Sequence, residues 1–255
     1  MAAFILGVEV ECRLANVIFG SKNLGWHVTG AVGSIGAAAA ARRLLGLNED
    51  QMVCAFGITA TQPGGLRDMY GAVCKRFTPG RASQNGLGAA LLAAKGFGSS
   101  DQSIEAPMGF AKILADISDL AGLTQDLGNS YEIMTNNYKP FACAIVLHPI
   151  IDRCLQLREK NQIKPDQVER VTLTVNSNVI KLAGKENPET GLEAKFSFGH
   201  VVALALVKGA AGQPQFSDAL VKDEEIRNIR EWVSARVKDG IAKDEARVEI
   251  FLRGG

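Results

Sequence analysis

The fold of this chain is decided by GWHVTGAVGSIGAAAAARRLLGL, residues 25–47, and by a second run of similar composition, FTPGRASQNGLGAALLAAKGF, residues 77–97. Each contains a long segment dominated by Ala, Gly and Leu, and each segment ends at a glycine, the residue that most often terminates a helix. We predict helices over Ala31–Leu45 and Arg81–Lys95. Their small side chains let helix backbones approach closely, so these two helices should form the centre of a bundle.

Two further helices complete the predicted bundle. Ala2–Phe19 has apolar residues at helical spacing with a charged strip. Asn48 precedes another apolar segment and is followed three residues later by Gln51, which is the spacing of a capping box. That helix should end before Pro63. Short connections between helices of this kind are typical of an α-helical bundle.

Polar residues gather at the starts of the two central helices. They are Trp26, His27 and Thr29 before the first, and Lys75, Arg76 and Arg81 around the second. The first N–H groups of a helix have no partner within the helix and favour anions. We therefore predict a pocket for a small polycarboxylate or phosphate, with Trp26, Thr29, Arg76 and Arg81 as binding residues.

The second half of the chain changes character. We predict helices over Phe141–Leu157, Ala194–Lys208 and Asp223–Val237, and alternating β-branched strands over 168–175 and 247–252. The sequence thus predicts a mainly α protein: a helical bundle domain at 1–138, followed by an α+β domain at 139–255.

Four spaced motifs resemble the MmgE/PrpD family: GWHVTGAVGSIGAAAAARRLLGL, QPGGLRDMYGAVCKRFTPGRASQNGLGAALLAAKGF, YKPFACAIVLHPIID and GLEAKFSFGH. That family includes 2-methylcitrate dehydratases, cis-aconitate decarboxylases and an epimerase. The resemblance implies acid–base chemistry on a small carboxylate substrate, with no metal and no organic cofactor. It also implies a homodimer. The expected contact surfaces are the Ala/Gly-rich helices, whose small residues allow close approach, and Ala2–Phe19, where Phe4 and Val8 would otherwise face water.

The resemblance also implies catalytic roles for four residues. His27 would handle a proton or bind a carboxylate, and imidazole suits proton transfer near neutral pH. Lys75 and Lys139 match lysines of the family motifs, and a cation can hold a carboxylate or an enolate-like intermediate. His200 stands where decarboxylase-type relatives carry a tyrosine, which weakens the case for that decarboxylation. Lys195 would be a second carboxylate contact or an ion-pair partner.

Composition narrows the function classes. The 28 basic and 27 acidic residues give a net charge of +1, so nothing favours nucleic-acid or membrane-surface binding. Five cysteines without metal-ligand spacing indicate a reducing compartment, the cytoplasm or the mitochondrial matrix. Cys143 and Cys154 are expected to be core thiols, and His148 a structural histidine. Charges at Glu9, Glu11 and Arg13 argue against a signal peptide or membrane span near the start.

Compared with the family pattern, the chain is expected to lack an Asp- and His-bearing segment at its start. Its last strand is expected to lack the return strand of a hairpin. Three hypotheses follow. The first is a lyase, most simply a dehydratase of the 2-methylcitrate type, with a decarboxylase as a variant. The second is an isomerase, epimerase or cyclase that returns the proton elsewhere, and the third a truncated, non-catalytic paralogue that binds a partner.

Overall fold

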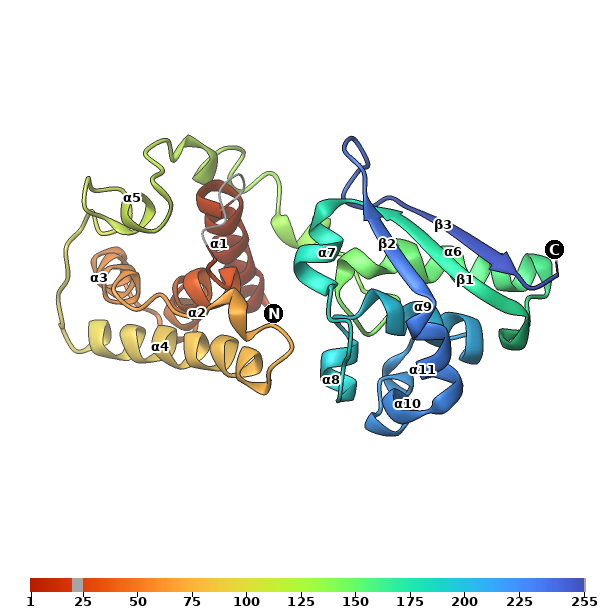
Figure 1. Cartoon of the computed structure of the whole chain (residues 1–255). Helices are drawn as coiled ribbons and strands as arrows, with labels where there is room; N and C mark the ends of the chain where they lie inside the picture. Colours follow the sequence, from red (N-terminus) through yellow and green to blue (C-terminus); the bar gives the residue numbers. More distant parts are fainter. Residues whose placement is uncertain (20–24, 255) are drawn as a thin grey trace. The chain divides into compact units, whose positions relative to one another are not determined.

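A computed structural model describes residues 1–19 and 25–254, and the chain divides into two compact units, Met1–Asn137 and Tyr138–Gly255 (Figure 1). The first unit is helical, and the second combines helices with a three-stranded sheet. The predicted fold class, a helical domain followed by an α+β domain, is confirmed.

The first unit is built around one central helix. Its α-helices are α1 (Ala2–Phe19), α2 (Val28–Leu45), α3 (Glu49–Ala60), α4 (Phe77–Ala94) and α5 (Phe110–Ala115). Short 3-10 helices lie at Arg67–Met69, Val73–Arg76, Ala121–Leu123 and Glu132–Thr135. Helix α2 contacts α1, α3 and α4, so the most Ala- and Gly-rich segment lies at the centre of this unit (Figure 1).

Sequence signals explain the boundaries of these helices. The capping box is confirmed: Asn48 Oδ1 accepts from the Gln51 amide at 2.9 Å, and the Asn48 amide donates to Gln51 Oε1 at 3.0 Å. Helices α2 and α4 begin at Val28 and Phe77, three and four residues before the predicted starts. Thr29 therefore belongs to α2 and not to the loop before it, and Arg81 lies inside α4 and not at its start.

One glycine shows how closely α2 and α4 pack. A Cβ atom at Gly86 would lie 2.4 Å from the carbonyl oxygen of Ser34 and 2.5 Å from Cβ of Ala37. No side chain fits there unless the two helices move apart. The small residues of these helices thus have the packing role predicted for them.

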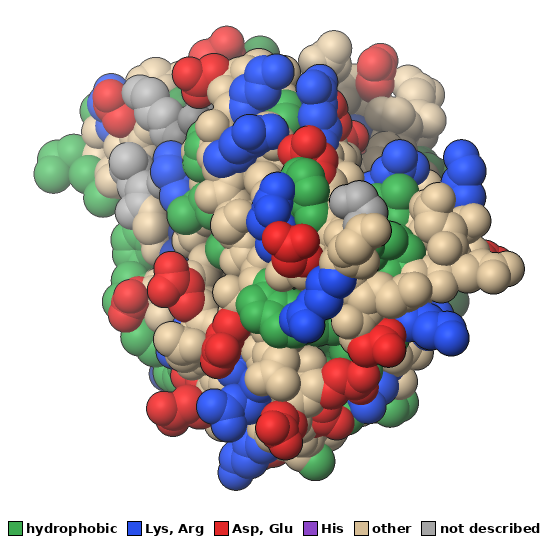
Figure 2. All heavy atoms as spheres, turned by 45° about the vertical axis from the view of Figure 1, so that its right-hand side comes forward, with side chains coloured by type: hydrophobic (Ala, Val, Ile, Leu, Met, Phe, Trp, Pro, Cys, Tyr) green, Lys and Arg blue, Asp and Glu red, His purple; other side chains and the backbone are tan. Residues whose placement is uncertain are grey.

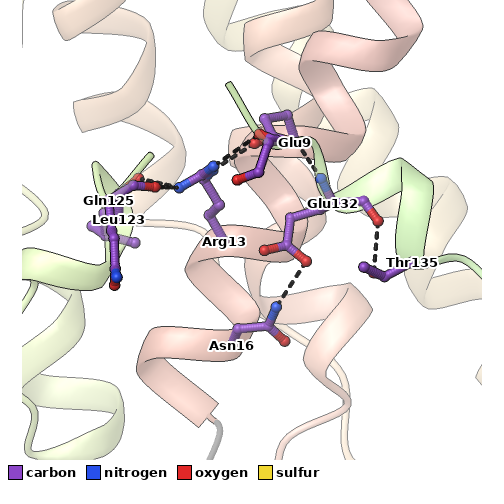
Figure 3. Close-up of polar contacts among 8 residues, drawn as sticks. Glu9, Arg13, Asn16, Leu123, Gln125, Glu132 and Thr135 are labelled. Atoms are coloured by element: carbon purple, nitrogen blue, oxygen red, sulfur yellow. Dashed lines mark hydrogen bonds and ion pairs between the residues drawn. The ribbon is translucent and has the colours of Figure 1, made fainter. Parts of the chain in front are cut away.

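A buried ion pair attaches an irregular segment to α1. Arg13 is paired with Glu9 one turn earlier, and both side chains are less than one-tenth exposed. Arg13 Nη1 donates to the carbonyl oxygen of Gln125 at 2.6 Å, and Nη2 donates to that of Ser130 at 3.2 Å. Glu9 Oε2 accepts from the amide of Glu132 at 2.7 Å (Figure 3). These contacts supply backbone partners for residues 123–132, which have little regular structure of their own.

The second unit combines one small sheet with several helices. Its helices are α6 (His148–Asn161), α7 (Ser177–Ala183), α8 (Gly191–Ala194), α9 (Phe198–Lys208), α10 (Asp218–Lys222) and α11 (Glu224–Glu231), with 3-10 turns at Ile145–Leu147, Pro165–Gln167 and Gln213–Gln215. Its strands are β1 (Val168–Val175), β2 (Val233–Val237) and β3 (Ala246–Leu252), in the order β2-β1-β3. Strand β1 pairs parallel to β2 and antiparallel to β3. Helix α9 packs against α6 and α11 in the main core of this unit.

Strands β1 and β3 lie where they were predicted, but three helix predictions in this unit need correction. Residues 141–144 are irregular, and α6 begins only at His148, with Pro149 in its first turn. The predicted helix 194–208 is interrupted, because the Ser197 side chain caps α9. The charged helix α11 ends at Glu231, and 233–237 form strand β2.

The absence of a hairpin return strand after the last strand stays a prediction, but that strand is paired along one of its edges. Strand β3 pairs with β1 along its length, from Val175 opposite Ala246 to Val168 opposite Leu252, with one irregularity near Arg170. The backbone hydrogen bonds of this edge are therefore made within the unit, and β3 is an edge strand of the described sheet. No return strand is needed to satisfy the edge that faces β1.

The surface is mixed in charge. On the face that Figure 2 shows, Lys and Arg side chains alternate with Asp and Glu, with apolar patches between them. None of the helices in the described residues is long and apolar enough to cross a membrane. In the first unit, Phe4 is 61% exposed and lines a groove of about 480 Å³ together with Val8, Leu44 and Leu87. The homodimer that the sequence suggested through Phe4 and Val8 stays a prediction.

Candidate active site

His27 lies at the junction of two loops in the first unit. It is the last residue before α2 and is 8% exposed. Its amide donates to the carbonyl oxygen of Gly65 at 3.0 Å, and the amide of Arg67 donates to that of Gly25 at 2.8 Å. Gly65 has φ +92°, and a Cβ there would lie 3.1 Å from Cβ of His27. A glycine at 65 therefore lets the loop after α3 lie directly against the histidine.

The side-chain contacts of His27 fix its tautomer. Its Nδ1 lies 2.7 Å from Oγ1 of Thr78. The Thr78 hydroxyl donates to the carbonyl oxygen of Lys75, also at 2.7 Å. Because the hydroxyl proton is used in that bond, the Thr78 oxygen accepts from Nδ1–H of the imidazole. In the neutral ring the lone pair is then on Nε2, the nitrogen that can take up a proton.

An aromatic ring and a cation complete this group, which we call the His27 site: His27, Tyr70, Lys75 and Thr78. The ring of Tyr70 meets that of His27 edge to face, with centroids 5.6 Å apart and planes at 87°. Lys75 Nζ lies 4.7 Å from the centroid of Tyr70. Burial lowers the pKa of His27, and the positive charge of Lys75 lowers it further. The imidazole is therefore neutral near pH 7 and able to act as a base.

The other predicted binding residues of this unit differ in exposure. Trp26 is half-buried and forms a β-bridge with Leu66. Thr29 and Arg76 are exposed. Arg81 is exposed on α4, where its Nη1 donates to Oε1 of Gln84 at 2.9 Å. Of the three predicted cations, Lys75 is the one whose contacts include a residue of the His27 site.

The predicted lysines of the second unit gather near one cysteine. Lys139 Nζ donates to the carbonyl oxygen of Cys143 at 3.2 Å, and the Ala144 amide donates to that of Lys195 at 3.0 Å. Lys195 Nζ donates to Oε1 of Gln213 at 2.6 Å. Burial raises the pKa of the Cys143 thiol to about 12, against the opposing effect of the two lysines. Cys143 is thus a protonated core thiol, as is Cys154, whose burial also raises its pKa to about 12.

The two histidines of the second unit are core residues. His200 is 0% exposed, neither ring nitrogen has a hydrogen-bond partner, and burial, aided by the charge of Arg230, lowers its pKa to about 4. His148 is 9% exposed, its ring meets Phe141 edge to face, and burial lowers its pKa. A substrate has no surface of His200 to contact. The catalytic role predicted for it stays a prediction that this burial disfavours.

The structure thus brings His27 and Lys75 together in the first unit, and Lys139 and Lys195 near Cys143 in the second. Sequence reasoning missed Thr78 and Tyr70. Thr78 is the second residue of the quoted run FTPGRASQNGLGAALLAAKGF, so a hydroxyl near a helix start was an available signal. Tyr70 had no comparable signal. Among the described residues, His, Cys, Asp and Glu nowhere form a group of three that could hold a metal ion.

Two family models and several curated proteins match this chain. The MmgE/PrpD N-terminal domain model matches residues 1–122, and the MmgE/PrpD C-terminal domain model matches residues 141–255. A cis-aconitate decarboxylase of Aspergillus terreus is 27% identical over 99% of this chain and 57% of its own length. That of Mus musculus is 25% identical over 90% of this chain and 48% of its own. The cis-aconitate decarboxylase-like protein oryM of Aspergillus oryzae is 29% identical over 85% of this chain and 48% of its own.

The chain therefore spans about half the length of the curated relatives it matches. The two domain models follow each other in the order of the two structural units, and together they account for nearly all of the sequence. The chain belongs to the MmgE/PrpD family.

Proposed function

We propose that this chain acts as a lyase on a small polycarboxylic acid, with His27 transferring a proton at a carbon of the substrate. The observation that carries the proposal is the hydrogen bond between Nδ1 of His27 and Thr78, which assigns the lone pair of the neutral ring to Nε2. A lowered pKa keeps that nitrogen available near pH 7. Lys75, which contacts the ring of Tyr70 as His27 does, supplies the positive charge that binds a substrate carboxylate.

Decarboxylation is the first candidate reaction, because the similar curated proteins are named cis-aconitate decarboxylases. In an unsaturated polycarboxylate the bond to one carboxylate breaks and carbon dioxide leaves. The electron pair of that bond forms a new double bond, while the former alkene carbon takes a proton. His27 would first take up a proton from water on Nε2, then donate it to that carbon and return to its neutral form, and Lys75 would hold a remaining carboxylate.

Dehydration, the reaction favoured by the sequence, is the second candidate. Here neutral His27 would remove a proton from the carbon next to a carboxylate, and the electron pair of that C–H bond would form the double bond. The departing hydroxide would take up the proton from His27 and leave as water, which returns the ring to its neutral form. The lowered pKa of His27 supports this proton removal, because the ring is unprotonated near pH 7 and can act as the base. Lys75 would stabilise the negative charge that develops on the carboxylate.

The test is to incubate the protein with cis-aconitate, 2-methylcitrate or citrate in deuterated water and to follow products by NMR. Decarboxylation should release carbon dioxide and place one deuteron on carbon, whereas dehydration should yield an alkene. His27→Gln should abolish either signal, and Lys95→Ala, at an exposed helix end, should not. Exchange of substrate protons for deuterium without elimination would replace the lyase by an isomerase.

A further inference from the structure

The contacts of Tyr70 extend beyond His27. We propose that Tyr70 is a positioning residue that holds the ammonium group of Lys75 beside the imidazole of His27. The inference deepens the proposed function, since it names what keeps the two groups of that site together. It rests on three elements that meet at one ring: the residue before α2, the loop after the 3-10 helix Arg67–Met69, and the 3-10 helix Val73–Arg76.

The geometry at the ring is that of two distinct aromatic interactions. Lys75 Nζ is 4.7 Å from the Tyr70 centroid, well within the roughly 6 Å over which an ammonium is attracted to a ring face. The imidazole of His27 meets the same ring at 5.6 Å and 87°, an edge-to-face arrangement that aromatic pairs favour. One side chain therefore contacts both the proton-transfer group and the cation.

Lysine needs such support more than other cations do. Its ammonium sits on a flexible four-carbon stem and loses much rotational freedom when it is held in one place. The bond from the Thr78 hydroxyl to the Lys75 carbonyl holds its main chain, and the contact with the Tyr70 ring acts on the ammonium group itself. The ring face of Tyr70 can therefore fix where the charge lies relative to His27.

Among the described residues, Lys75 and Arg67 each place a positive charge near this ring. Arg67 is the second, with its Cζ at 6.0 Å from the Tyr70 centroid, at the limit of the attraction. The Thr78 hydroxyl on the remaining side of His27 is neutral. If the ring is removed, Lys75 can turn toward solvent, its field at His27 is screened, and the imidazole becomes more hydrated. Each change raises the pKa of His27.

NMR titration of the histidine rings in the protein without substrate tests this. The chain has three histidines, so His27→Gln identifies the His27 signal, and His148 and His200 in the second unit are internal references. Tyr70→Leu keeps apolar bulk but removes the ring, and it should raise the pKa of His27. Tyr70→Phe keeps the ring and should preserve the wild-type value. Because the titration uses no substrate, its result can be interpreted even if the protein shows no activity in the lyase assay.

A double-mutant cycle shows whether Tyr70 acts through Lys75. Lys75→Met should also raise the pKa of His27, and adding Tyr70→Leu to it should raise that pKa by clearly less than Tyr70→Leu does alone. The same rise in both backgrounds would overturn the proposal, because it would mean that Tyr70 only shields His27 from water. An unchanged pKa in a folded Tyr70→Leu protein would overturn it as well.

Discussion

His27 and His200 are both buried next to the start of a helix, yet their surroundings differ completely. Nδ1 of His27 is bonded to a hydroxyl, and its ring meets a tyrosine that also contacts a lysine. His200 lies in the core beside Phe216, close enough to Arg230 to feel its charge, and neither of its ring nitrogens has a hydrogen-bond partner among the described residues. Burial lowers the pKa of both rings. The difference shows that burial alone makes a histidine neutral. A hydrogen bond at one ring nitrogen is what determines which of the two nitrogens can accept a proton.

The strongest test of this comparison is the loss of each imidazole. His27→Gln should lower turnover by about two to four orders of magnitude, the usual contribution of a general acid or base. His200→Phe should leave turnover near that of the wild type, because the ring lies in the core. Initial rates from the NMR assay would measure both. If His200→Phe stays folded but loses as much turnover as His27→Gln, the two histidines have the same kind of role and the comparison fails.

The second test concerns acid stability. The pKa of His200 is about 4 in the folded chain, below the ordinary value of about 6.5 for an unfolded one. Between these values the unfolded chain binds a proton that the folded chain excludes. Stability is therefore fully present above pH 6.5 and falls by about 3 kcal/mol in total as pH drops to 4.

His200→Phe should remove most of that acid-dependent loss. Urea unfolding at pH 7 and pH 4.5 would measure it, with Trp26→Phe as the background so that Trp232 fluorescence reports on the second unit alone. His148 stays in place and retains its own smaller contribution. An equal loss with and without His200 would show that another group carries the acid sensitivity.

The third test concerns substrate binding by the lysine of the His27 site. Lys75→Ala should weaken binding of a dicarboxylate inhibitor by about 1.5–3 kcal/mol, the scale of a hydrogen bond to a charged group. Lys95→Ala should have no such effect, because Lys95 is exposed at the end of α4. Isothermal titration calorimetry would measure both. Equal weakening by the two substitutions would remove Lys75 from the binding site.

The smallest expected effect tests the hydroxyl that fixes the tautomer. Thr78→Val keeps the shape of the side chain but removes the oxygen that accepts from Nδ1 of His27. We expect kcat/KM to fall about fivefold, which corresponds to about 1 kcal/mol for one neutral hydrogen bond. Thr78→Ser should restore it. A Thr78→Val enzyme with unchanged kcat/KM would show that Tyr70 alone is enough to orient the ring.

Much of the fold followed from local signals in the sequence. The capping box at Asn48, the glycine-terminated helix α2 and the alternating strand β1 were predictable because each is determined by neighbours within a few residues. Residues 233–237 were not. The charged helical pattern of α11 continues into these residues, so the sequence predicted one longer helix. They form β2 because they pair in parallel with β1, some 60 residues away in sequence.

The site divides in the same way. His27 and Lys75 stood in motifs that contain helix starts, so their type and position could be recognised. Tyr70 could not, because its significance arises from contacts with His27 and Lys75 across separate segments. His200 stood in a motif as well, but pattern alone does not reveal that its helix turns the ring into the core.

The buried pair of Glu9 and Arg13 bears on how the first unit folds. Arg13 binds carbonyl groups more than 100 residues further along the chain, and contacts of such long sequence separation form slowly because a large loop must close first. The bundle of α1, α2 and α4 can form from nearer contacts. We therefore expect residues 123–132 to gain order last and, in the native protein, to exchange their amide hydrogens earlier than the helices to which they are bound.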